Sequence, residues 1–327
     1  MINRRQFVLR FLSAILFGLV VTAATAAVPK TTVLSDQRVL VLGDSITQDG
    51  RYVSFLEYYF HEASPAIRCD LISIGLGSET VSGLSEPDHP YPRPCVLERL
   101  DRALKAVKPQ IVFACYGMND GIYHPSSPDR LAAFNAGLHQ LIEKVRATGA
   151  QLVLITPPVF DPKPLSANTV PATAAKFGYG TPYADYDDVL AEFARIESAL
   201  NEPGVTVIDL HTPMVAALVA QREADPQFSF AKDGVHPGDL GHLLMARIIA
   251  TGLGLATPSE SMPKELADIS ADPVFALVRE RRELRSESWL PFIGYTRDGT
   301  FKSSSVSAAE KVAARLQDTL FTPIAAH

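Results

Sequence analysis

Five short apolar runs, rich in β-branched residues, recur along the chain with room for a helix between them. They cover residues 39–42, 71–74, 111–115, 152–155 and 205–210. Segments with apolar residues at helical spacing separate these runs and follow the last one, at residues 52–63, 96–107, 131–147, 183–200, 213–222 and 240–253. Strands that alternate with helices predict an α/β protein, in which a five-stranded parallel sheet is covered on both faces. We expect one three-layer α/β/α domain over residues 34–255.

Beyond this domain the pattern changes. A Pro/Ser-rich link, a charged helix and a last helix are expected at residues 257–263, 273–284 and 308–320. Between the two helices lie Trp289, Phe292 and Tyr295, and we expect these aromatic side chains to anchor the segment on the main domain rather than to form a binding patch. Residues 256–327 are therefore predicted to be a helical C-terminal extension.

The N-terminus has the pattern of an export signal. Three arginines precede an apolar run at residues 11–21, and Ala24-Thr25-Ala26 provides a cleavage site. We expect a cleavable signal at residues 1–26 and a mature protein in the periplasm or outside the cell. Residues 3–8 resemble a twin-arginine signal, whereas a general secretory signal and a retained anchor stay open as alternatives.

Composition limits the classes of partner. The 327 residues are 47% hydrophobic and 20% charged, as in an ordinary globular protein. The formal net charge of −6 becomes −9 when the signal is removed, because that segment holds three arginines and no acidic residue. With no block of like charges, a nucleic-acid partner is disfavoured, and no stable membrane span is expected after removal of the signal.

Three cysteines are too few for a disulfide framework. Cys115 lies inside an apolar run and is expected to be a buried hydrophobic residue. A bridge between Cys69 and Cys95 stays open outside the cytoplasm. None of the three has the spacing of metal ligands, and no metal or other cofactor is expected.

The first predicted strand ends abruptly at Gly43-Asp44, and Ser45 follows directly. Ligand sites in parallel α/β sheets form outside the carboxyl ends of the strands. A hydroxyl there meets the substrate while the strand behind it fixes its position. Ser45 is therefore a candidate nucleophile, provided that the chain supplies a base and oxyanion donors.

A candidate base lies in the Asp233-Gly234-Val235-His236 segment, before the last helix of the domain. An Asp three residues before a His can place both side chains on one side of a turn. The carboxylate then binds one ring nitrogen, and the other nitrogen faces the cleft, as a general base requires. A capping Asp and a surface His would also explain this pair.

Two further polar segments follow strands. Asn119, after the third strand, can point its amide N–H at a developing oxyanion, and Gly75, after the second, allows a close approach of backbone N–H. Each could equally form a simple turn. The Pro-rich loop 87–94, which holds His89, and the long loop 157–182 are interpreted as walls of the cleft, with surface insertions as the alternative.

The order of these segments resembles the GDSL-type, or SGNH, hydrolase family over residues 38–247. The matching blocks are Gly43-Asp44-Ser45, Gly75 with Thr80, Gly117-Met118-Asn119-Asp120 and Asp233-Gly234-Val235-His236. The resemblance implies the flavodoxin-like SGNH fold.

It further implies Ser45 as nucleophile, His236 as base and Asp233 as its orienting partner. The implied oxyanion hole consists of the backbone N–H groups of Ser45 and Gly75 and the side chain of Asn119. Gly77 is a rival to Gly75, because the second block departs from the family: Ser73 stands where it often has Asn. Candidates for lining the substrate cleft are Asp44, Asp120, His89 and His124.

The predicted function is hydrolysis of carboxylic esters through an acyl-enzyme, with O-acetyl groups of a polysaccharide as the expected substrate. A lysophospholipase or thioesterase of the same family, and a catalytically silent carbohydrate-binding domain, stay open. An α/β-hydrolase fold is disfavoured, since Thr47 replaces the second glycine of its Gly-x-Ser-x-Gly motif. A metal-dependent phosphoesterase, with Asp44, Asp120, His124, Asp233 and His236 as ligands, would leave Ser45 unexplained.

Overall fold

The computed structural model describes residues 37–63, 70–294 and 305–321. The export signal, Cys69 and Tyr295 lie outside these residues, so what was expected of them stays a prediction. Within the described part of the chain, no helix has both the length and the apolar composition that a bilayer crossing requires.

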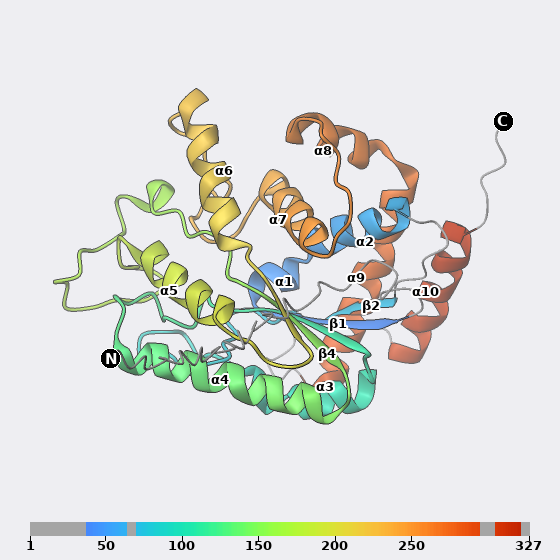
Figure 1. Ribbon diagram of the computed structural model, residues 1–327, viewed down its shortest axis with the longest axis horizontal. Coiled ribbons are helices and arrows are strands. Elements are labelled where there is room, and N and C mark those ends of the chain that lie inside the picture. The colour runs from blue at the N-terminus through green and yellow to red at the C-terminus, as the bar shows by residue number, and fades with distance from the viewer. Residues whose placement is uncertain (1–36, 64–69, 295–304, 322–327) are drawn as a thin grey trace, which may run out of the picture.

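A five-stranded parallel sheet forms the centre of the protein (Figure 1). Its strands are β1 (Arg38–Gly43), β2 (Asp70–Ser73), β3 (Ile111–Cys115), β4 (Gln151–Ile155) and β5 (Val205–Ile208). The order β2-β1-β3-β4-β5 places the change of winding direction between β1 and β3, which is where ligands bind in flavodoxin-like sheets. The predicted fold class is confirmed.

Helices cover both faces of this sheet. Those of the main domain are α1 (Ser45–Asp49), α2 (Arg51–Ala63), α3 (Leu100–Val107), α4 (Pro128–Ala147), α5 (Tyr186–Ser198), α6 (His211–Ala224) and α7 (Asp239–Gly252), with short 3₁₀ turns η2 (Val96–Glu98) and η3 (Lys163–Leu165). Helices α2 and α7 lie on one face and α3 and α4 on the other (Figure 1). The sheet is buried between these layers, and Cys115 is buried with it, as expected.

Helix α1 was not predicted, although it carries Ser45. Asp44 caps it, because its Oδ1 accepts a hydrogen bond from the backbone N–H of Ile46 at 2.9 Å. Gly50 ends the helix in the left-handed conformation (φ 71°), and α2 begins at the next residue. Ser45 therefore lies at the start of a five-residue helix, not in an open loop.

The C-terminal region is more helical than predicted. Helix α8 (Met262–Ala271) occupies part of the expected link, and α9 (Pro273–Ile293) continues through Pro291, far beyond the predicted end at residue 284. Helix α10 (Val306–Phe321) packs against α9. The boundary between the main domain and the extension stays a prediction.

Helix α9 covers the outer edge of β2. Arg285 donates from Nη1 to the carbonyl oxygen of Leu71 at 2.7 Å and pairs with Asp70 at 2.6 Å. An edge strand otherwise presents unpaired backbone groups to solvent. Trp289 is buried and donates to Glu310 of α10, whereas Phe292 is exposed, so Phe292 is not the anchor that was expected of it.

Candidate active site

The polar segments singled out in the sequence meet at the carboxyl edge of the sheet. Ser45 follows β1, Asn119 follows β3, and Asp233 and His236 lie in the loop that leads to α7. The first two positions flank the point where the strand order reverses. The topology of the sheet thus gathers residues that are up to 191 positions apart.

Ser45, His236 and Asp233 form a continuous chain of hydrogen bonds. Ser45 Oγ lies 2.8 Å from His236 Nε2, and His236 Nδ1 lies 2.7 Å from Asp233 Oδ2. Because an ionised carboxylate can only accept, Nδ1 carries the proton and Nε2 is left to accept the Ser45 hydroxyl proton. This arrangement can activate a serine hydroxyl.

The turn that holds Asp233 and His236 is fixed by backbone contacts. Asp233 Oδ1 accepts from the N–H groups of Val235 at 3.0 Å and His236 at 2.7 Å. Gly234 has φ 74°, and a Cβ there would lie 2.4 Å from the Asp161 carbonyl oxygen, so a side chain would disrupt the turn. Asp161 belongs to the loop 157–182, and its backbone N–H donates to the Gly234 carbonyl oxygen at 2.9 Å, so this loop packs directly against the turn.

The electrostatics of this pair favour an ionic form. Hydrogen bonding to Asp233 raises the pKa of His236, partly opposed by burial. Burial opposes ionisation of Asp233 too, but hydrogen bonds from His236 and Val235 lower the pKa of its carboxyl to about 2. The carboxylate stays charged at neutral pH and stabilises the imidazolium that proton transfer would create.

The side-chain amide of Asn119 is fixed in orientation by its hydrogen-bond partners. Its Oδ1 accepts from Arg93 Nη1 at 2.8 Å and from the Tyr123 hydroxyl at 3.3 Å. Its Nδ2 donates to the Glu79 carbonyl oxygen at 3.3 Å. Among the described residues Nδ2 makes this one hydrogen bond, and the role of the amide as an oxyanion donor stays a prediction.

The two glycines after β2 have different surroundings. A Cβ on Gly75 would lie 2.3 Å from the backbone nitrogen of Gln48, so Gly75 permits close packing on α1. A Cβ on Gly77 would lie 3.9 Å from the Cβ of Ser45, and Gly77 N–H donates to Gln48 Oε1 at 2.6 Å. Gly77 lies beside the nucleophile, and the role expected of Gly75 stays a prediction.

Two of the residues expected to line the cleft are buried instead. Asp44 caps α1, and burial raises the pKa of its carboxyl to about 7. Asp120 accepts from the backbone N–H groups of Val81, Ser82 and Gly117 at 2.8, 2.7 and 2.9 Å, which ties the loops after β2 and β3 together. Neither carboxylate reaches solvent, so the expectation that they contact substrate is not met.

The two histidines on the same list lie in aromatic surroundings. His89 packs edge-on against Tyr91 and Tyr179, in the two loops predicted to wall the cleft. His124 packs against Phe177, and burial lowers the pKa of its imidazole. Within the described residues, no group of three or more His, Cys, Asp or Glu side chains is placed to hold a metal ion.

Sequence reasoning missed the residues that hold Asn119. Arg93 and Glu86 form a buried pair, with Arg93 Nε and Nη2 each 2.6 Å from a Glu86 oxygen. Arg93 belongs to the Pro-rich loop 87–94. That loop was singled out for its prolines and His89, but nothing in the local pattern shows that an arginine there reaches Asn119.

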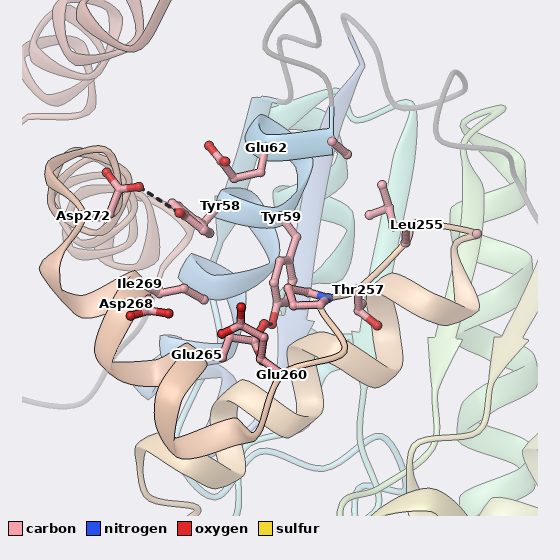
Figure 2. A pocket seen from close by; sticks show the side chains of 14 residues that line it. Tyr58, Tyr59, Glu62, Leu255, Thr257, Glu260, Glu265, Asp268, Ile269 and Asp272 are labelled. Carbon is pink, nitrogen blue, oxygen red and sulfur yellow. Dashed lines mark hydrogen bonds between the residues drawn. The ribbon is translucent and has the colours of Figure 1, made fainter.

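Two cavities lie on the side of the protein that carries α7 and α8. One of about 500 Å³ is lined by Asp233 and His236 together with Phe228, Phe230 and Leu240. Another, of about 800 Å³, lies between α2 and α8 (Figure 2). Its lining includes none of the predicted catalytic residues, and its tyrosines are engaged with acidic side chains, as Tyr58 is with Asp272 at 2.8 Å.

Comparison with known proteins identifies related families and folds. The model of the GDSL-like lipase/acylhydrolase family matches residues 41–244, more than half of the chain. No curated protein sequence matches.

Solved structures share the fold at low identity. A gut microbial diltiazem-metabolizing enzyme is 20% identical, with a TM-score of 0.52; the match covers 67% of this chain and 47% of that enzyme, so this chain spans about half of its length. A catalytic mutant of an acetylxylan esterase from Geobacillus stearothermophilus is 19% identical, with a TM-score of 0.51 and coverage of 69% and 98%. A putative GDSL-like lipase from Parabacteroides merdae is 19% identical, with a TM-score of 0.50 and coverage of 70% and 100%.

Proposed function

We propose an acyl-enzyme mechanism for this protein, which belongs to the GDSL-like lipase/acylhydrolase family and is a hydrolase of ester bonds. Ser45 is the nucleophile, His236 the general base and Asp233 the residue that orients His236. The observation that carries this proposal is the hydrogen-bond chain of 2.8 and 2.7 Å that joins the three side chains.

The reaction proceeds in two steps. His236 Nε2 takes the proton of Ser45 as Oγ attacks the ester carbonyl carbon, and it then returns that proton to the leaving alkoxide. The resulting acyl-enzyme is hydrolysed by water, which His236 activates in the same way. Asp233 holds the tautomer that both steps require.

The oxyanion is stabilised by Asn119 and by the backbone N–H groups of Ser45 and Gly75, because the N–H of Gly77 already donates to Gln48. A donor that is fixed before the reaction needs no reorganisation as charge develops, and loss of one such donor typically costs about 2.7 to 4 kcal/mol. Variants of the acetylxylan esterase described as catalytic mutants replace a serine, an aspartate or a histidine, the three residue types of this site.

The proposed substrate is an O-acetyl group on a polysaccharide that the protein meets after export. The His236 and Asp233 side chains are 47% and 56% exposed, so the site opens directly to solvent. Such a site suits a small acyl group on a bulky chain. The structural similarity to an acetylxylan esterase supports this choice.

A second candidate is a thioesterase or lysophospholipase activity on longer acyl chains. The cavity beside His236 favours it, because Phe228, Phe230 and Leu240 give that cavity an apolar lining. An acyl chain bound there would gain about 0.8 kcal/mol per buried methylene.

Both candidates are tested with Ser45→Ala and a control, Ser259→Ala, at an exposed position in the link before α8. Acetate release from acetylated xylan and hydrolysis of p-nitrophenyl acetate, butyrate, octanoate and laurate are measured. We expect wild type and the control to release acetate and to prefer the shortest ester, and Ser45→Ala to be inactive.

A preference for octanoate or laurate would select the second candidate. Full activity of Ser45→Ala would contradict the mechanism. A fluorophosphonate probe that fails to label Ser45 in the wild type would instead indicate a silent binding domain.

A further inference from the structure

We propose that Arg93 is a positioning residue that sets the oxyanion hole through Asn119. This inference rests on the proposed function, because it assigns Arg93 a role in the same acyl transfer. The observation behind it is that the buried guanidinium of Arg93 binds Asn119 Oδ1. The N–H of the same amide is the proposed oxyanion donor.

The guanidinium of Arg93 divides its donors between two partners. Nε and Nη2 bind the two Glu86 oxygens, each at 2.6 Å, which fixes the plane of the group. The third nitrogen, Nη1, lies in the same plane and donates to Asn119 Oδ1 at 2.8 Å. The Arg93 and Glu86 side chains are 1% and 0% exposed, so water does not compete for these contacts.

The same nitrogen also reaches the loop after β2, in which Gly77 lies beside the nucleophile. Nη1 lies 3.5 Å from the carbonyl oxygen of Ser78, the residue after Gly77. One guanidinium therefore contacts both the side-chain donor, Asn119, and the backbone segment beside Ser45. Arg93 is also held over the ring of Tyr123, 5.5 Å from its centroid, and the Tyr123 hydroxyl is the other donor to Asn119.

This contact decides which end of the Asn119 amide faces the reaction. A guanidinium has donors and no acceptor, so the atom it binds is the oxygen, and the nitrogen lies on the opposite side. A charged donor on the oxygen also draws electron density from the nitrogen and strengthens its N–H as a donor. Arg93 thus both orients and polarises the proposed oxyanion donor.

The pair remains ionic in its buried position. Burial opposes ionisation of Glu86, but hydrogen bonds from Arg93 hold the pKa of its carboxyl below the usual value. Replacing only one partner would strand the other charge in the interior and destabilise the fold. The informative variant therefore removes both charges with apolar side chains of similar size, as Arg93→Met with Glu86→Leu.

The matched control removes a second buried pair at a distance from the site. Arg281 and Glu57 join α9 to α2 and are each 5% exposed; Arg281 also lies 3.5 Å from Asp70, and among the described residues the ion pairs of these two side chains involve none of the proposed catalytic residues. Arg281→Met with Glu57→Leu reports the cost of losing a buried ion pair as such. Thermal unfolding and steady-state kinetics on p-nitrophenyl acetate are measured for both double variants.

We expect Arg93→Met/Glu86→Leu to lower kcat about 10- to 100-fold with little change in KM. A slightly misplaced Asn119 N–H stabilises the transition state less but hardly affects binding of the substrate. The control should keep kcat within about twofold of wild type. In an Asn119→Ala background the Arg93/Glu86 change should lower kcat less than about threefold, because its target is already gone. If the double variant does not fold, Arg93→Lys replaces it, because lysine keeps the charge but lacks the planar set of donors. It is measured in the same two backgrounds, with Asn119 and with Asn119→Ala.

Equal losses with and without Asn119, or an unchanged kcat in a folded variant, would overturn the proposal. Labelling of Ser45 by a fluorophosphonate separates this failure from a failure of the proposed function. If the wild type is labelled and Ser45→Ala is inactive, the acyl-enzyme mechanism stands whatever the result for Arg93.

Discussion

The two halves of the proposed site differ in their contact with water. The side chains that would move protons are half exposed, at 47% for His236 and 56% for Asp233. The side chains that would hold the oxyanion donor are buried, at 1% for Arg93 and 0% for Glu86. A general base such as His236 must exchange protons, and deep burial would lower its pKa. A hydrogen-bond donor to an oxyanion, in contrast, is most effective when it is fixed in place and shielded from water.

Removing the base should produce the largest loss. His236→Ala leaves Ser45 without a proton acceptor, and we expect kcat/KM on p-nitrophenyl acetate to fall about 10⁴- to 10⁶-fold, as for other serine hydrolases. Because the site is open, the unfolding temperature should change little. His139→Ala, on α4, is the control with unchanged activity. A loss of less than tenfold in His236→Ala would show that another group acts as base.

Removing the buried donor should produce a smaller loss. In Asn119→Ala the nucleophile and base remain, and we expect kcat to fall about 10²- to 10³-fold with a nearly unchanged KM. Single-turnover acylation, followed by release of p-nitrophenol, measures the step concerned. An effect confined to KM would place Asn119 in ground-state binding instead.

The exposed half of the site and the buried Asn119 could be singled out from sequence, whereas Arg93 and Glu86, which hold Asn119, could not. Asp233 and His236 are three residues apart, and Ser45 directly follows a strand, so local pattern and parallel topology were sufficient. Arg93 reaches Asn119 across 26 residues because two loops fold together, and no periodicity records that contact. Asp44 and Asp120 were misjudged for the same reason, since their backbone partners follow from loop conformation.

The fold shows the same division. The five strands follow from apolar runs that are long enough to be recognised, and all five were expected. Helix α1, with five residues, is too short for a periodic signal and depends on the Asp44 cap and Gly50. Helix α9 continues past Pro291, although a proline usually ends a helix, because Arg285 binds the edge strand β2 and the buried Trp289 binds Glu310 of α10.

A buried carboxylate that is not paired with a cation should affect the pH dependence of stability in the opposite way to Glu86. Asp44 has no paired arginine, and its pKa of about 7 exceeds the usual 3.8. Between these values the folded protein binds a proton that the unfolded chain does not, so this residue lowers stability as pH rises from about 4 to about 7. Asp44→Asn keeps a capping side chain and should be more stable than wild type at pH 8, by at most about 4 kcal/mol.

Urea unfolding of both proteins at pH 5 and pH 8 measures this difference. The free energies of unfolding of wild type and Asp44→Asn should differ little at pH 5 and more at pH 8. Parallel curves for the two proteins would mean that the Asp44 carboxylate is ionised in the fold throughout this range. Glu86 has the opposite effect, because Arg93 lowers the pKa of its carboxyl. The stability that this carboxylate contributes at neutral pH should be lost only as the pH falls into the acid range.

The smallest expected effect is a displacement of the pH profile, and it separates the two halves most directly. His236 acts as a base only when neutral, so kcat/KM should fall on the acid side as pH drops through its pKa, which hydrogen bonding to Asp233 raises. In Asp233→Asn the acid limb should move to lower pH, because the group that favours the imidazolium is gone. In Asn119→Ala the limb should stay in place while the plateau falls, since the amide does not titrate. A limb that moves in Asn119→Ala would show that the buried half also controls the protonation of His236, and that the two halves are coupled through charge rather than through the substrate alone.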